Sequence, residues 1–298
     1  MMRIPFRQVD AFADAPFTGN PAAVMLLDTW LADAVMQAIA AENNLSETAF
    51  LVPCPDPETA DFDLRWFTPG LEVALCGHAT LASGHVILCA AAGMAQARFS
   101  TQKAGVLTVC RDGDGYAMTL PSWPADTAII EGEAVAIAAA LGAKPLETWG
   151  RGSDYRVAVF ANAADVRALT PDYRAIMALQ TGQDLMIVAT APGDTTDVVS
   201  RVFVPEAGID EDPVTGSAHA IIAGYWARRL GRDTFTAFQA SRRGGRLGVT
   251  LSGDRVILTG RCRTVIEGEF VLALSDASAS LHRADAGPPI FQDARPRQ

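Results

Sequence analysis

Residues 104–121, AGVLTVCRDGDGYAMTLP, and residues 244–260, GGRLGVTLSGDRVILTG, are two copies of one pattern. In each copy, two apolar stretches flank a Gly-Asp pair, which is typical of two strands joined by a tight turn. The matched positions are Gly105, Leu107, Val109, Gly113 and Asp114 in the first copy and Gly245, Leu247, Val249, Gly253 and Asp254 in the second, each pair 140 positions apart. This self-similarity indicates that one supersecondary unit occurs twice in the chain.

Two further matches precede each copy in the same order. RWFTP at 65–69 resembles RVFVP at 201–205, and each segment leads to a glycine that begins a long apolar stretch. Gly77 begins GHATLASGHVILCAAAG and Gly216 begins GSAHAIIAGYWARRLG. A helix that is apolar on most faces is buried rather than laid on a surface. The sequence therefore predicts an α+β fold of two pseudo-symmetric lobes, each a curved and mostly antiparallel sheet wrapped around a central helix.

The length of the chain, 298 residues, accommodates two such lobes. We assign residues 1–121 to the first lobe and residues 122–284 to the second, with a linker near PSWPADTAIIEGE at 121–133. Residues 285–298 belong to a stretch rich in proline, glycine and charge. This composition predicts a loose tail.

Composition excludes several classes of function. A net charge of -10 without a basic stripe argues against non-specific nucleic-acid binding. No apolar run reaches the roughly 18 residues of a membrane span, and the N-terminus lacks the apolar region of a signal peptide. The five cysteines are odd in number and scattered without CxxC spacing, which argues against a disulfide framework or a metal site. We expect a cytoplasmic protein without a membrane or nucleic-acid partner.

The loops that enter the two predicted central helices are the first candidates for a functional site. They are EVALCGHAT at 72–80 and GIDEDPVTGSAH at 208–219. Equivalent loops of two pseudo-symmetric lobes are expected to face each other across the interlobe cleft, where ligand pockets are common. The first N–H groups of a helix have no partner within it, so two helix starts at one cleft would attract an anion. His78 lies in one loop and Asp212 in the other.

A carboxylate stands between a predicted helix and a predicted strand in NLSETAFL at 44–51. The preceding segment LADAVMQAIAAEN has roughly helical apolar spacing, and TAFLV reads as a short strand. Joints of this kind often line clefts. Taken alone, Glu47 has the simpler interpretation of a solvated or helix-capping residue.

Four segments together resemble the phenazine biosynthesis PhzF-like family: DAFADAPFTGNPAAV, NLSETAFL, WFTPGLEVALCGHATLA and GIDEDPVTGSAH. The resemblance runs from about residue 5 to about residue 272. It implies the diaminopimelate-epimerase-like fold, an active site between the lobes, and a cofactor-free isomerase that is often a homodimer. It also implies that Glu47 moves a proton on the substrate's carbon skeleton, assisted by His78 and Asp212, as in the isomerisation of trans-2,3-dihydro-3-hydroxyanthranilate.

The same motifs imply the groups that hold the substrate's polar substituents. The predicted substrate-binding set is Asn20, Ser46, Gly77, Ala79, Thr215, Gly216 and Ser217. The chemistry agrees, because a carboxylate can take and return a proton within one cavity and helix N-termini stabilise the charge that develops. A histidine near an aspartate can have its tautomer fixed. We therefore expect a small carboxylated substrate, cyclic or amino-bearing, and no cofactor or metal.

Two other functions remain open from the sequence. Epimerases of related architecture use two cysteines as acid and base, and Cys76 lies at a predicted helix start that could activate it. The opposing segment EDPVTGSAH contains no cysteine, which disfavours that mechanism. The second alternative is a small-ligand-binding protein that keeps the fold without turnover.

Three more residues are weaker candidates. We expect His219, one turn into the second helix, to be packed rather than catalytic. Arg242 and Arg243 could reach an anionic substrate, although a solvated turn is the simpler interpretation.

Overall fold

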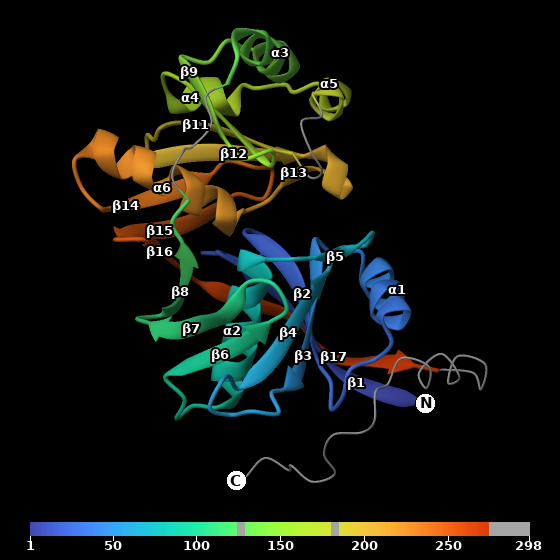
Figure 1. Ribbon diagram of the computed structural model, residues 1–298. Coiled ribbons are helices and arrows are strands. Elements are labelled where there is room, and N and C mark those ends of the chain that lie inside the picture. Colours follow the sequence, from blue (N-terminus) through green and yellow to red (C-terminus); the bar gives the residue numbers. More distant parts are fainter. Residues whose placement is uncertain (124–128, 180–184, 274–298) are drawn as a thin grey trace.

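The computed structural model describes residues 1–123, 129–179 and 185–273. Within them the chain forms two sheet-rich halves, with the blue and green first half below the yellow and orange second half (Figure 1). The predicted tail at 285–298 and part of the predicted linker lie outside the described residues. No helix within these ranges is long and apolar enough to cross a bilayer.

The first half consists of strands with two helices, α1 and α2, between them. Its elements are β1 (Met2–Ala11), β2 (Asn20–Leu26), α1 (Asp33–Asn43), β3 (Glu47–Pro53), β4 (Phe62–Phe67), β5 (Glu72–Val73), α2 (Gly77–Ala90), β6 (Gln96–Thr101), β7 (Gly105–Asp112) and β8 (Gly115–Pro121). The strands pair in the order β1-β2-β3-β4-β6-β7-β8. The β2–β3 and β4–β6 pairs are parallel and the others antiparallel. Each parallel pair is joined by a crossover that contains a helix, α1 or α2, as parallel pairing requires.

The second half has the same topology. Its elements are α3 (Glu131–Leu141), β9 (Glu147–Arg151), β10 (Tyr155–Val159), α4 (Ala163–Arg167), α5 (Tyr173–Ala178), β11 (Met186–Pro192), β12 (Val198–Val204), the 3₁₀ turn η1 (Pro205–Ala207), β13 (Ile209–Asp212), α6 (Gly216–Leu230), β14 (Thr234–Gln239), β15 (Gly245–Ser252), β16 (Arg255–Gly260) and β17 (Cys262–Leu272). The strands pair as β9-β10-β11-β12-β14-β15-β16, with β10–β11 and β12–β14 parallel. The predicted α+β class is therefore confirmed.

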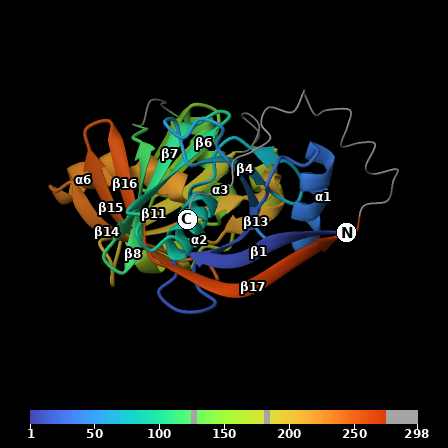
Figure 2. The same cartoon turned by 90° about the horizontal axis from the view of Figure 1, so that it is seen from below.

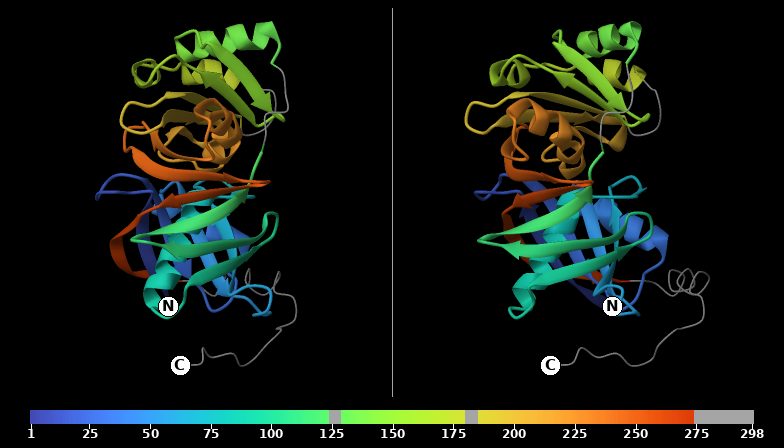
Figure 3. Two further views of the ribbon diagram at one scale, coloured as in Figure 1. Left: turned by 90° about the vertical axis from the view of Figure 1, so that its left-hand side faces the viewer. Right: turned by 60° about the vertical axis from the view of Figure 1, so that its left-hand side comes forward.

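The two apolar helices lie inside the curved sheets, as predicted. Helix α2 packs against β1, β2, β3, β6, β7 and β8, and Figure 2 shows it enclosed by strands of the first half. A Cβ on Gly84 of α2 would lie 2.4 Å from Val109, so this helix approaches β7 too closely for any larger residue. Helix α6 packs against β15, β16 and β8, and both views of Figure 3 show its half stacked on the first. The amphipathic helix α1 covers the outer face, where Met36 and Ile39 pack with Phe50 and Phe67.

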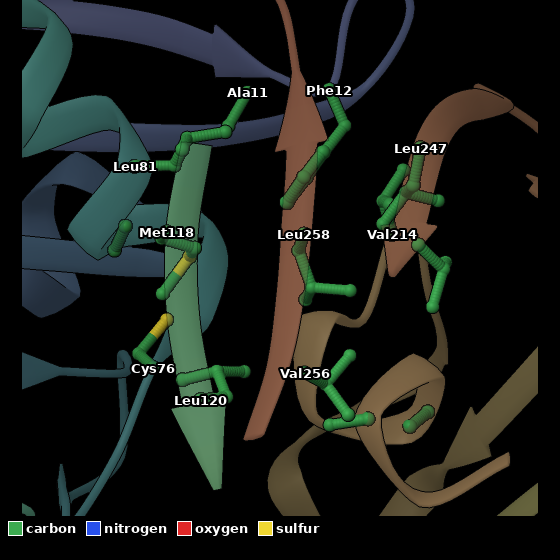
Figure 4. Packing of buried hydrophobic residues seen from close by; sticks show 14 of the residues in the cluster. Ala11, Phe12, Cys76, Leu81, Met118, Leu120, Val214, Leu247, Val256 and Leu258 are labelled. Carbon is green, nitrogen blue, oxygen red and sulfur yellow. The ribbon is translucent and has the colours of Figure 1, made fainter. Parts of the chain in front are cut away.

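The repeated hairpins meet at the junction of the two halves. Strand β8 pairs antiparallel with β16, and Met118 lies directly opposite Leu258. These two residues are equivalent positions of the 140-residue repeat, so a pseudo-two-fold axis passes between them. Figure 4 shows Met118 and Leu120 of β8 beside Leu258 and Val256 of β16, all in one apolar cluster. The apolar core is therefore continuous from one half to the other.

Matching ion pairs brace the loops that lead into the two central helices. Arg65 of β4 donates to both carboxylate oxygens of Glu72 in β5, each at 2.7 Å. Arg201 of β12 does the same to Glu211 in β13, at 2.7 and 2.9 Å. Such bidentate pairs fix geometry as well as charge. Both arginines come from the RWFTP and RVFVP repeats, so these repeats hold the loops in equivalent positions.

The last strand does not follow the predicted division of the chain. The predicted second lobe spans residues 122–284, but β17 pairs antiparallel with β1 of the first half, from Met2↔Leu272 to Ala11↔Cys262. The chain thus returns to the first half after β16. The pairing also carries the residues of β17 beside the N-terminal strand that leads to Asn20.

Candidate active site

Four predicted residues converge where the two halves meet. Glu47 is the first residue of β3, Asn20 is the first residue of β2, His78 lies in the first turn of α2, and Asp212 ends β13. The parallel pairing of β2 with β3 sets Ala22 opposite Glu47, so Asn20 and Glu47 start neighbouring strands at one edge (Figure 1).

The N-termini of α2 and α6 contact each other through glycine. A Cβ on Gly77 would lie 3.5 Å from Gly216 Cα, and a Cβ on Gly216 would lie 3.3 Å from Leu258 Cδ1. The absence of a side chain at both positions lets the two helix starts approach backbone to backbone. The first helical bonds are Thr80 N–H to Cys76 O at 3.2 Å and His219 N–H to Thr215 O at 3.3 Å.

The N–H groups of residues 77–79 and 216–218 come before these first bonds along the chain, so they have no acceptor within their own helices. Two sets of such donors near one point attract negative charge. Each helix start also contributes a positive dipole end. This arrangement is suited to holding a carboxylate.

Asn20 links the two halves of the site. Its Nδ2 donates to Asp212 Oδ1 at 2.8 Å and to Val214 O at 2.9 Å, and it lies 3.1 Å from His78 Nδ1. Its Oδ1 accepts from Ser46 Oγ at 2.9 Å, which fixes the orientation of the amide. The amide has two hydrogens, which Asp212 Oδ1 and Val214 O accept at the shorter distances, so His78 Nδ1 lies in close contact with Asn20 without receiving a hydrogen of its own.

Glu47 and His78 form the closest pair of titratable groups in the site. Glu47 Oε2 and His78 Nε2 are 2.9 Å apart, and the side chains are 16% and 5% exposed. Their alignment is not that of a hydrogen bond, so both atoms are buried without a hydrogen-bond partner among the described residues. Buried polar atoms are normally hydrogen-bonded, so a ligand group or a reacting proton would complete the bonding of both atoms.

The pKa of His78 is raised above its ordinary range. Burial would lower this pKa, but the interactions of His78 with Cys76 and Glu47 outweigh it. Burial also raises the pKa of the Cys76 thiol to about 11, and the charge of Glu47 adds to the effect. Since Cys76 is then a neutral thiol at pH 7, the charge that favours the imidazolium there is that of Glu47.

Asp212 is held by the second half. Its Oδ2 accepts a short hydrogen bond from the Thr215 hydroxyl, and its backbone carbonyl accepts from Gln239 Nε2 at 2.6 Å. Burial raises the pKa of Asp212, against the opposing effect of nearby His78. Asp212 thus contacts the first half directly at Asn20, and within the described residues it is linked to His78 through Asn20.

A buried network supports the start of α6. His219 is fully buried, its Nδ1 lies 2.8 Å from Thr215 O, and its Nε2 lies 3.2 Å from Ser200 Oγ. Burial lowers the pKa of His219 to about 4, so the ring is neutral at pH 7. His219 is thus packed, as predicted.

The remaining predicted residues lie around this core in different roles. Thr215 uses its hydroxyl on Asp212 and its N–H on Gln239 Oε1 at 2.8 Å, so its polar groups organise the loop. Ser217 accepts from the Tyr155 hydroxyl at 3.0 Å. Ala79 is buried in the first turn of α2.

The two arginines before the second hairpin, Arg242 and Arg243, have different surroundings in this structure. Arg243 pairs with Asp10 at 2.8 Å and donates to Gly19 O at 2.8 Å. It therefore anchors the loop before Asn20. Arg242 is exposed on the turn.

Sequence reasoning missed Gln239, Ser200 and Tyr155. Gln239 is fully buried at the end of β14, where it follows Phe235 and Ala237 on the inward face. A polar residue at an inward position of an alternating strand was the available signal. Ser200 and Tyr155 carry no such signal, because their partners come from distant segments.

A separate groove of about 410 Å³ does not include any of the predicted residues. Its lining includes Asp14, Asp114, Arg246 and Arg261. Arg261 pairs with Asp114 at 2.6 Å and Arg246 with Asp14 at 3.4 Å, so these charges are matched within the protein. We therefore place the candidate site at Glu47 and His78.

Comparison with known proteins assigns the family. The model of the phenazine biosynthesis-like protein family matches residues 9–268. An uncharacterized isomerase of Pseudomonas aeruginosa is 42% identical, over 91% of this chain and 100% of that protein. The chain belongs to the phenazine biosynthesis-like family, as the four motifs predicted.

Solved structures agree with the fold. The crystal structure of a PhzF family protein of Enterococcus faecalis is similar, with a TM-score of 0.82, 42% identity, and coverage of 91% of this chain and 100% of that chain. A hydroxyproline epimerase of Agrobacterium vitis has a TM-score of 0.55 at 13% identity, with 95% of this chain and 98% of that chain covered. The second likeness concerns the fold alone.

Proposed function

We propose that this protein is an isomerase that moves a proton on a small carboxylated substrate, with Glu47 as the group that takes and returns the proton. The observation that carries the proposal is the buried ion pair of Glu47 Oε2 and His78 Nε2, 2.9 Å apart at the start of α2, where the N-terminus of α6 also lies. The names of the curated relatives as isomerases support the same class of reaction.

Each part of the site has a distinct task in this proposal. The N–H groups of residues 77–79 and 216–218 hold the substrate carboxylate and stabilise the charge that develops when a carbon loses its proton. Glu47 carries the proton between two carbons, and His78 faces Glu47 with a proton on Nε2. Asn20 packs against His78 Nδ1, and Asp212 and Ser46 fix the orientation of Asn20.

Substrate has to enter a nearly closed site. The side chains of Glu47 and His78 are only 16% and 5% exposed. We therefore propose that the two halves open to admit the substrate and close over it, which excludes water from the proton in transit.

The epimerase alternative has less support from the geometry. A two-base mechanism through cysteine needs a second thiol opposite Cys76, and the equivalent loop of α6 carries Thr215. A pKa of about 11 also leaves Cys76 protonated at pH 7, whereas a cysteine base has to be a thiolate. A homodimer and a cytoplasmic location remain proposals, supported by the family resemblance and by the sequence.

Glu47→Gln tests the proposal. The change is nearly isosteric, so folding and ligand binding should be little altered, while the carboxylate that carries the proton is lost. We expect exchange of substrate carbon protons with solvent deuterium to fall at least about a hundredfold. The measurement is a nuclear magnetic resonance screen of small cyclic and amino-bearing carboxylic acids, with dihydrohydroxyanthranilate as the first trial.

Arg242→Gln is a suitable control, because Arg242 is an exposed residue on a turn. Exchange by Glu47→Gln at the wild-type rate would contradict the proposal. Tight binding of an acid without any exchange by the wild-type protein would favour the non-catalytic binding function instead.

A further inference from the structure

The candidate active site contains three side chains of types that bind metal ions. One ligand atom from each of Glu47, Cys76 and His78 lies within 4.8 Å of the other two. Cys76 and His78 are buried and Glu47 is partly buried. A thiol, an imidazole and a carboxylate are together the donor set that Zn²⁺ prefers, whereas Mg²⁺ and Ca²⁺ prefer oxygen alone. The cysteine spacing did not predict this cluster, because Cys76 and His78 lie at the start of α2 and Glu47 comes from β3.

The distances are close to those of a metal site. Two ligands of one tetrahedral Zn²⁺ ion are separated by roughly 3.3–3.8 Å, given bond lengths of about 2.0–2.3 Å. Cys76 Sγ and His78 Nδ1 are 3.5 Å apart, which already fits. The closest printed approach of Glu47 is to the other ring nitrogen, with Oε2 2.9 Å from Nε2, so the Glu47 side chain has to turn toward the Nδ1 side to complete a third ligand position.

Nδ1 of His78 can leave its contact with Asn20 and bind a cation. Asn20 Nδ2 has two hydrogens, and Asp212 Oδ1 and Val214 O accept them at 2.8 and 2.9 Å. Its 3.1 Å contact with His78 Nδ1 is the longest of the three. Asn20 therefore stays paired when Nδ1 binds a cation.

Charge also has to be weighed, because the two helix starts disfavour a cation. Each helix start carries only about half of a positive elementary charge. A thiolate and a carboxylate also neutralise the two charges of the ion. The ligands therefore outweigh the dipoles.

We propose that Glu47, Cys76 and His78 form a binding site for a thiophilic divalent cation, with Zn²⁺ as the best fit, and that the bound cation blocks the site. Binding forms a sulfur–metal bond and releases the thiol proton of Cys76 to solvent, without any change of oxidation state. The fourth coordination position is left for water or a substrate carboxylate. The cation is an inhibitor and not a cofactor, since it occupies the carboxylate that would carry the proton. Only this inhibitory clause rests on the proposed function; binding of the ion does not.

Cobalt is the probe for the site, because Co²⁺ bound to a thiolate has a charge-transfer absorption in the near ultraviolet. The full chain is freed of metal with a chelator, titrated with Co²⁺, and then titrated with Zn²⁺ against a chromophoric chelator. We expect one Co²⁺ per chain with this absorption. In Cys76→Ser the absorption should disappear, and Zn²⁺ affinity should fall at least about tenfold.

The chain offers a matched control in a second cysteine–histidine pair. Cys89 Sγ lies 3.6 Å from His85 Nδ1, also on α2, but the described part of the chain offers no third ligand of this kind there. Cys89→Ser should keep both the absorption and the affinity. Loss of the absorption in Cys89→Ser, or its persistence in Cys76→Ser, would overturn the proposal.

Glu47→Gln tests the third ligand and guards against misfolding of the cysteine variant. It should keep the sulfur absorption but bind Zn²⁺ at least about tenfold more weakly. Unchanged Zn²⁺ affinity would exclude Glu47 and with it the three-ligand site. If no acid shows deuterium exchange, the proposed function fails, while the cobalt absorption still decides the metal site.

Discussion

Asn20 shows most clearly what a single residue does in this fold. Its amide is bonded to Ser46, Asp212 and Val214 and lies beside His78, so it joins two strands and two helix starts. Four residues predicted from separate motifs, Asn20, Glu47, His78 and Asp212, come together around it. The motifs could bring these residues to one cleft, but they could not show that Asp212 acts on Asn20 rather than directly on His78. That detail depends on side-chain positions across two halves of the chain.

The role of Cys76 leads to a prediction at the same scale. Burial raises the pKa of its thiol to about 11, so it is not a base at neutral pH, and no second thiol faces it across the loops. Cys76→Ser keeps the size and polarity of the group. We expect deuterium exchange to remain within about tenfold of the wild-type rate, less than the loss of an acid/base group.

The measurement is the exchange assay used for Glu47→Gln, with the two variants compared on the same substrate. A loss of more than about a hundredfold in Cys76→Ser would revive the epimerase mechanism.

At the scale of elements, the short strands before the central helices depend on the paired arginines. Arg201 and Glu211 have side chains 11% and 14% exposed, and Arg201 also donates to Leu169 O at 2.7 Å. Arg201→Met should leave Glu211 as an unpaired, largely buried carboxylate. We expect the free energy of unfolding to fall by roughly 3 kcal/mol, measured by urea denaturation.

The double variant Arg201→Met with Glu211→Gln is the control, because it removes both charges together. It should recover part of the loss if the unpaired carboxylate is the cause. Equal stability of the single and double variants would mean that packing of the arginine, and not its charge, holds β13 in place.

His219 in helix α6 leads to a prediction about the stability of the fold at acidic pH. Burial lowers the pKa of this side chain from 6.5 to about 4. Between these values the unfolded chain binds a proton that the folded protein does not, so stability is fully present above about pH 6.5 and is lost as the pH falls to about 4. The loss amounts to roughly 3 kcal/mol. It is measured by urea unfolding at a series of pH values.

His219→Asn keeps a donor near Thr215 O but does not titrate in this range. The variant should be less stable at pH 7 and should also depend less on pH between 4 and 6.5. The raised pKa of Asp212 acts in the opposite sense and is common to both proteins, so the difference isolates His219. An unchanged pH dependence in the variant would show that His219 is not the cause.

At the scale of the whole molecule, the repeat predicted the architecture of the two halves, but it did not predict where the last strand, β17, pairs. The two copies of strand, turn and strand reappear as β7–β8 and β15–β16, and the glycines that begin the apolar stretches begin α2 and α6. The return of β17 to β1 could not be predicted, because this strand lies after the repeat and its partner is at the other end of the chain. Local pattern carries no information on such a pairing, which depends on tertiary structure.

The last prediction concerns the point where the two halves touch. Gly216 faces Gly77 across the junction, and a Cβ on Gly216 would lie 3.3 Å from Cδ1 of the fully buried Leu258. Gly224 lies further along the same helix, and a Cβ there would meet nothing within 4 Å. Gly224→Ala should therefore raise the free energy of unfolding by about 0.5–1 kcal/mol, since alanine favours a helix over glycine. Gly216→Ala should instead lower it and slow deuterium exchange, because the added methyl group crowds the buried Leu258 and thereby shifts the start of α6 beside Gly77. Thermal unfolding and the exchange assay on both variants measure these effects. If both variants gain stability and exchange at the wild-type rate, then the close approach of Gly77 and Gly216 is not what holds the two halves in register.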